Sequence, residues 1–106
     1  MGYERERKRW IAVGQNAAFR SNQAVVRTAE SLAGPLSPPS LLYRIPDADP
    51  ANGADKDTWC YQTLAHPEFR RGDQVLLTYA CNSFEYGNLV KDLRIYFPKA
   101  VYVSLP

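Results

Sequence analysis

The strongest β-strand signal in the chain is QVLLTYA, residues 74–80. A polar turn, RRGD at residues 70–73, precedes it, and Gly72 suits that turn because glycine adopts positive φ angles at little cost. On the other side of the turn stands WCYQTLA, residues 59–65, which alternates and is rich in strand-forming residues. Pro67 follows and is expected to end that strand. The two stretches therefore predict an antiparallel hairpin.

The two cysteines of the chain lie on the two predicted strands of this hairpin. Pairing about the turn places Cys60 opposite Cys81, close enough for a disulfide in an oxidising compartment. A bend at Pro67 leaves the register open, so a reduced and buried pair is the alternative. A nucleophilic cysteine is not expected, because the single histidine, His66, lies on the same strand as Cys60.

The rest of the chain continues in short strands. They are expected at residues 10–14, 24–28, 41–45 and 100–104. A polar segment at 15–23 predicts a turn, and no segment has a sustained 3.6-residue periodicity. We therefore predict an all-β fold with antiparallel sheets of three to four strands. Such sheets, repeated along the chain, are typical of β-propeller blades, and a small face-to-face sandwich is the alternative.

The strand pattern divides the chain into four parts: a charged, solvated N-terminal arm at 1–9, a first blade-like sheet at 10–46, a linker loop at 47–57 and a second, closing blade-like sheet at 58–106. The arm is expected to be solvated because its charges are mixed in sign and it has no apolar stripe. The linker, DADPANGADKD, holds four aspartates, but they lack the ligand alternation and late glutamate of a calcium loop. The sequence predicts neither a metal nor a cofactor.

Composition excludes several classes of protein. The 106 residues include 13 Lys and Arg and 11 Asp and Glu, a formal net charge of +2, which is too balanced to indicate a nucleic-acid or membrane partner. One histidine and two cysteines are too few for a His/Cys metal cluster. No apolar run approaches the roughly 18 residues of a membrane span, and no signal peptide is recognised, so localisation stays open.

Two stretches resemble a known family. The first is VVRTAESLAGPLSPP at 25–39, followed by LYRIP at 42–46. It resembles the phrase R-T-A, S, G-P-x-S-x-P, L-Y of five-bladed β-propeller glycoside hydrolases, where it spans the middle of a blade. Leu36 departs from the phrase, because an aromatic residue is usual at that position.

The second stretch combines AHPEF at 65–69, VLLTYACNS at 75–83 and IYFPKAV at 95–101. It is similar to the closing blade of bacterial propellers that are catalogued as a domain of unknown function and related to endo-D-arabinanases. Phe97 and Lys99 stand where that family favours arginine. The resemblance implies that the chain equals the C-terminal two blades of a five-bladed propeller, from a family expected to be exported.

The resemblance also directs attention to three candidate sugar-binding residues. His66 would lie at the end of an inner strand and face the central channel, where it would bind a sugar hydroxyl, orient a water or hold a structural metal; alternatively it satisfies a backbone carbonyl beside Pro67. Asn82 would bond a sugar hydroxyl or cap the turn after its strand. Tyr86, in a predicted loop, would stack on a sugar ring.

No catalytic residue is predicted. Hydrolysis of a glycoside uses two carboxyl groups about 5 to 10 Å apart. The family's catalytic carboxylates are expected in earlier blades, and neither Glu68 nor Glu85, the carboxylates nearest the candidate residues, is assigned a role. We therefore expect a fragment of a carbohydrate-active propeller that contributes ring closure and sugar contacts. The alternative is a non-catalytic carbohydrate-binding or protein-interaction module that forms homo-oligomers through its open sheet edges.

Overall fold

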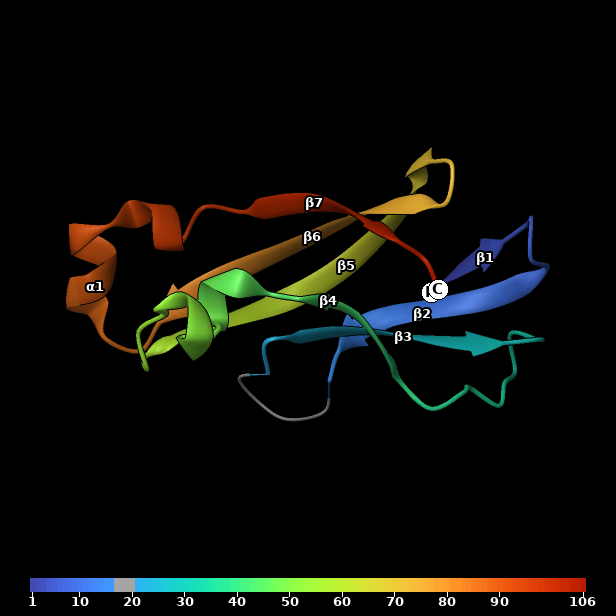
Figure 1. Ribbon diagram of the computed structural model, residues 1–106, viewed down its shortest axis with the longest axis horizontal. Helices are drawn as coiled ribbons and strands as arrows, with labels where there is room; N and C mark the ends of the chain where they lie inside the picture. The colour runs from blue at the N-terminus through green and yellow to red at the C-terminus, as the bar shows by residue number, and fades with distance from the viewer. Residues whose placement is uncertain (17–20) are drawn as a thin grey trace.

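The computed structural model describes residues 1–16 and 21–106, and in these ranges the regular structure is mostly β-strand (Figure 1). The strands are β1 (Gly2–Glu4), β2 (Arg9–Gln15), β3 (Gln23–Ala29), β4 (Ser40–Arg44), β5 (Thr58–Arg71), β6 (Gln74–Ser83) and β7 (Lys99–Ser104). Four short helical segments complete the chain: η1 (Pro46–Ala48), η2 (Pro50–Asn52), α1 (Tyr86–Lys91) and η3 (Leu93–Ile95). The turn expected at 15–23 falls partly outside the described residues. None of the described helices is long and apolar enough to cross a membrane.

The strands form two antiparallel sheets, which confirms the predicted fold class. The first sheet has the order β1-β2-β3-β4 and the second has the order β5-β6-β7. β5 is longer than expected, since it continues through Pro67 to Arg71. The pairing with β6 is interrupted between His66 and Arg71, so the proline lies where the ladder requires no N–H donor. The expectation that Pro67 ends the strand was therefore wrong.

The N-terminus differs from the solvated arm expected for residues 1–9. Residues 2–4 form β1, which pairs with β2 and places Tyr3 opposite Trp10, with ring centroids 5.2 Å apart. Glu4 is only 2% exposed. Residues 5–8 do form an exposed turn. The strand was missed because its buried charge is compensated by arginines, one of which lies far along the chain.

The two sheets share one hydrophobic core. The first sheet contributes Ile11, Ala24 and Val26, and the second contributes Val75, Leu77 and Val103, together with Leu105 beyond β7. Burial of these side chains is the main favourable term that holds the sheets face to face. A second cluster gathers Ile45, Tyr79 and the two cysteines.

Of the two alternatives that the sequence left open for the cysteines, the structure shows the disulfide. Cys60 lies directly opposite Cys81 in the β5–β6 ladder, and a disulfide joins them. Both side chains are almost fully buried. The amide of Gln15, on β2, donates to the carbonyl oxygen of Cys60 at 2.8 Å, so the first sheet is tied to the second beside the disulfide.

The sheets stack with corresponding strands over one another. β2 contacts β5, and β4 contacts β7. The chain leaves the first sheet at β4 and enters the second at β5, so the connection through η1 and η2 crosses from one edge of the stack to the other (Figure 1). The order β5-β6-β7 therefore runs across the stack in the same direction as β2-β3-β4, and β1 is an additional edge strand of the first sheet.

Apolar side chains also lie on the faces that point away from the shared core. Because side chains alternate along a strand, Leu76 and Thr78 face away from the side that holds Val75 and Leu77. Leu64 is paired with Thr78 and is 56% exposed, and it also borders a small cavity with Ile11 and Val13 of the first sheet. The first sheet has a similar outer face, on which Tyr3 and Trp10 lie side by side.

Candidate functional site

Two of the three predicted sugar-binding residues lie in one cavity. Asn82, at the end of β6, and Tyr86, at the start of α1, help to line a cavity of about 440 Å³. We call this cavity the Tyr86 groove; its lining residues are Asn82, Ser83, Tyr86, Leu89, Val90, Leu93 and Tyr96. The sequence placed Asn82 and Tyr86 in one loop region, and the structure brings them together.

Capping side chains fix the walls of the groove. The Glu85 carboxylate accepts a hydrogen bond from the backbone N–H of Gly87 at the start of α1. The Asp92 carboxylate does the same for Arg94 at the start of η3. Lys99, on β7, donates to the carbonyl oxygen of Ile95 at 2.9 Å and so ties η3 to the second sheet. The groove is thus held by contacts at the ends of each short helix.

The polar groups in the groove are neutral. Oδ1 of Asn82 accepts the backbone N–H of Ser83 at 2.8 Å, which makes Nδ2 the free donor of that amide. Asn82 therefore bonds the backbone after its strand, as one of the two alternatives expected, and it also lines the cavity. Within residues 1–16 and 21–106, no partner is found for the Nδ2 group of Asn82 or for the hydroxyls of Tyr86 and Tyr96.

His66 lies apart from the groove. It is opposite Leu76 on β6, six residues from Asn82, which corresponds to about 20 Å along the strand. Its Nε2 shares a hydrogen bond of 2.7 Å with the Thr78 hydroxyl, and its Nδ1 lies 3.4 Å from the Glu68 carboxylate. The ring thus has side-chain partners on both nitrogens. One small ligand does not reach both His66 and Asn82.

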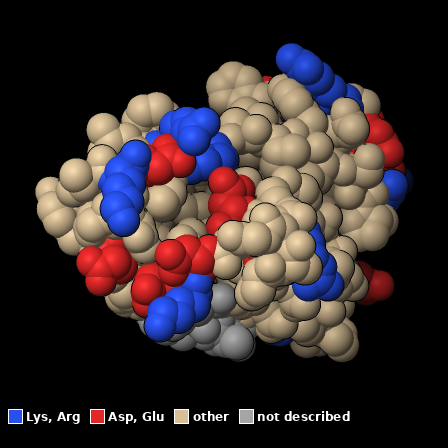
Figure 2. Space-filling model, turned by 60° about the vertical axis from the view of Figure 1, so that its left-hand side comes forward, with Lys and Arg blue, Asp and Glu red and all other residues tan. Residues whose placement is uncertain are grey.

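A second cavity, which the sequence did not reveal, lies beside η3. It is about 440 Å³ in volume, and its charged lining residues are Asp47, Asp55, Asp92, Arg94 and Lys99. We call it the charged hollow. Figure 2 shows acidic and basic side chains gathered at this end of the molecule. The only sequence signal was the aspartate-rich segment 47–57, because the other charges come from a distant part of the chain.

Each carboxylate of the charged hollow already has a protein partner. Asp47 accepts a hydrogen bond of 2.7 Å from the Tyr79 hydroxyl, and burial, reinforced by this bond, raises the pKa of Tyr79. Asp55 accepts from the Asn88 amide. Two hydrogen bonds from Arg94 lower the pKa of Asp92, whose carboxylate in turn raises the pKa of Arg94. These contacts hold loops together, and the described residues contain no group of three or more His, Cys, Asp or Glu that could hold a metal ion.

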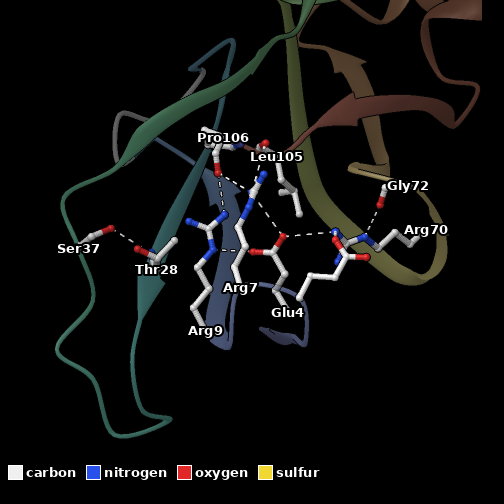
Figure 3. A network of polar contacts seen from close by, with 10 residues as sticks. Glu4, Arg7, Arg9, Thr28, Ser37, Arg70, Gly72, Leu105 and Pro106 are labelled. Atoms are coloured by element: carbon white, nitrogen blue, oxygen red, sulfur yellow. Dashed lines mark hydrogen bonds and ion pairs between the residues drawn. The ribbon is translucent and has the colours of Figure 1, made fainter.

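A network of arginines surrounds the buried carboxylate of Glu4 (Figure 3). Arg9 donates to one oxygen, while Arg7 and Arg70 each lie 3.4 Å from the other. Arg7 and Arg9 also donate to the main-chain oxygen of Pro106, at 2.8 and 2.7 Å. The same arginines border a cavity of about 790 Å³, but their guanidinium groups are already engaged. The network joins the β1–β2 hairpin to the β5–β6 hairpin and to the segment after β7.

The fold and the cavities define an all-β protein of two stacked antiparallel sheets with a neutral groove at one end. The comparison with protein families then assigns the chain. Residues 4–100 match the family described as domain of unknown function DUF5005, and the chain belongs to this family. No curated protein and no solved structure matches it. The expectation of a domain of unknown function is thereby confirmed.

Proposed function

We propose that the chain supplies two adjacent blades of a carbohydrate-active β-propeller. In this role it packs against further blades and contributes sugar contacts, and it does not cleave a glycosidic bond alone. The observation that carries the proposal is the stacking order, in which β2 lies against β5 and β4 against β7.

The crossing connection supports a propeller over a simple sandwich. In a propeller each blade starts at the central channel and ends at the rim, so the chain must return across the stack before the next blade begins. The segment between β4 and β5 makes such a return, and β5, the edge strand of the second sheet, then lies against β2, the second strand of the first. A sheet that merely folds back on its neighbour would place β5 against β4.

The outer faces support the need for neighbours. In a ring of blades every sheet is covered on both faces, whereas here each sheet has one covered face and one open face. Leu64 on the second sheet and Tyr3 on the first are 56% and 45% exposed. Open apolar faces of this kind mark interaction surfaces.

The carbohydrate part of the proposal rests on the resemblance to propeller glycoside hydrolases and on the chemistry of the Tyr86 groove. Tyrosine rings and an amide donor suit a ligand with apolar ring faces and hydroxyl edges. Catalysis is left to other blades, because the carboxylates of the charged hollow already accept hydrogen bonds from the protein.

The proposal predicts association through the outer face of the second sheet. Wild-type protein at about 100 μM is expected to scatter light as a species heavier than its 12.0 kDa monomer, because association buries the exposed apolar side chains of the open face. Leu64→Lys should shift the mass towards the monomer, since a charge on that face is costly to bury.

Leu32→Lys is the matched control, because Leu32 is 63% exposed in the loop after β3 and lies outside that face. It should associate like the wild type. A wild-type monomer at every concentration, with cooperative unfolding, would contradict the proposal. A closed assembly of fixed stoichiometry would favour the alternative, a self-associating module.

A further inference from the structure

The Tyr86 groove combines apolar walls with neutral hydrogen-bonding groups. Leu89, Val90 and Leu93 provide aliphatic surface, and Tyr86 is 75% exposed, so its ring is open to a ligand. No residue of the lining carries a charged side chain at neutral pH. A charged ligand would therefore lose hydration in the groove without gaining an ionic partner.

Four charged side chains beside the groove are engaged with the protein, whereas Lys91, which follows Val90 on α1, is exposed. Arg94 and Asp92 form a two-pronged pair, with Nε–Oδ1 and Nη2–Oδ2 distances of 2.8 and 2.9 Å. The ammonium group of Lys99 donates to the carbonyl oxygens of Arg94 and Ile95. The Glu85 carboxylate caps α1. Through these contacts Arg94, Asp92, Lys99 and Glu85 interact with the protein itself.

The free polar groups favour a ligand with many hydroxyls. Nδ2 of Asn82 can only donate, whereas each tyrosine hydroxyl both donates and accepts. The three groups come from β6, α1 and the turn after η3, so they border the groove from different elements. A sugar ring offers an apolar face to the tyrosines and hydroxyl edges to the amide.

We infer that the Tyr86 groove binds an uncharged glycan and discriminates against glycans that carry uronic acid or sulfate groups. This inference rests on the proposed carbohydrate function and adds the class of ligand and the place where it binds. His66, about 20 Å away along β6, is not part of this contact.

Affinity electrophoresis with soluble polysaccharides tests the inference. The probes are a neutral arabinan, a neutral xylan and an acidic polygalacturonate at matched concentrations. Wild-type protein should be retarded by a neutral polymer and not by polygalacturonate. Tyr86→Ala should weaken retardation about tenfold through loss of stacking, and Asn82→Leu about fivefold through loss of the donor.

Phe69→Ala is the matched control, because Phe69 is an exposed aromatic residue on β5 outside the groove. It should bind like the wild type. Val90→Lys provides a test of charge: it adds a cation to the lining and should create retardation by polygalacturonate.

The outcomes separate the inference from the function on which it rests. Neutral binding that Tyr86→Ala leaves unchanged would remove the groove as the site, while carbohydrate binding would stand. Equal or stronger binding of polygalacturonate by the wild type would overturn the uncharged class. Binding of none of the three polymers would overturn the inference and the carbohydrate part of the proposed function, and the light-scattering result would still decide the blade arrangement.

Discussion

Replacing both Cys60 and Cys81 by alanine is expected to lower the free energy of unfolding by about 3 kcal/mol. The disulfide closes a loop with a sequence separation of 21. Without this constraint the unfolded chain has a higher conformational entropy, which favours unfolding. Because domains of this size are stabilised by only about 5 to 15 kcal/mol, the loss would be a large fraction of the total. Urea denaturation followed by circular dichroism measures it.

Reduction of the wild-type protein is the independent control for this double substitution. Its midpoint in urea should fall towards that of the variant, and alkylation should label both cysteines only after reduction. Two freely alkylated thiols in protein from an oxidising compartment would refute the structural role of the disulfide. Equal midpoints before and after reduction would refute it as well.

Glu4→Gln is expected to lower the free energy of unfolding by about 2 to 3 kcal/mol. The substitution keeps the shape of the side chain but removes the negative charge that Arg7, Arg9 and Arg70 face. The three guanidinium groups would then repel one another around a buried amide. The figure lies below that for a fully buried pair because the arginine side chains are between 22% and 42% exposed.

Glu6→Gln is the matched control, because Glu6 also pairs with Arg70 but its side chain is 72% exposed. We expect a loss of no more than about 0.5 kcal/mol there. Hydrogen exchange adds a local measurement, since the amides that pair β1 with β2 should exchange faster in Glu4→Gln alone. Equal effects of the two substitutions would show that Glu4 is not the centre of the network.

Much of the fold was predictable because strand signals are local. The hairpin of β5 and β6 followed from alternation and from one turn, whereas Pro67 left open the register that sets Cys60 opposite Cys81. β1 was not predictable, since Glu4 is buried only because Arg70, 66 residues away, lies beside it. Alternation also cannot tell which face of one sheet meets which face of another, so the stacking order came only from the structure.

The candidate site also has a part that the sequence could predict and a part that it could not. Asn82 and Tyr86 are close in sequence, and their grouping in one groove was within reach of sequence reasoning. His66 was grouped with them by resemblance, but it is separated from Asn82 by the length of strand between Leu76 and Asn82. Asp47 and Lys99 both line the charged hollow, and nothing in the sequence indicates that two residues so far apart in the chain lie close together.

The proposed blade arrangement requires that the two sheets stack with β2 against β5 and β4 against β7. The most direct test is a set of nuclear Overhauser effects between methyl groups, recorded on Leu64→Lys to limit association. We predict effects between Val13 on β2 and Ala65 on β5, and between Leu42 on β4 and Val101 on β7, because these side chains border the shared core. Effects that join β4 to β5 across the sheets, with none between β2 and β5, would contradict the claim.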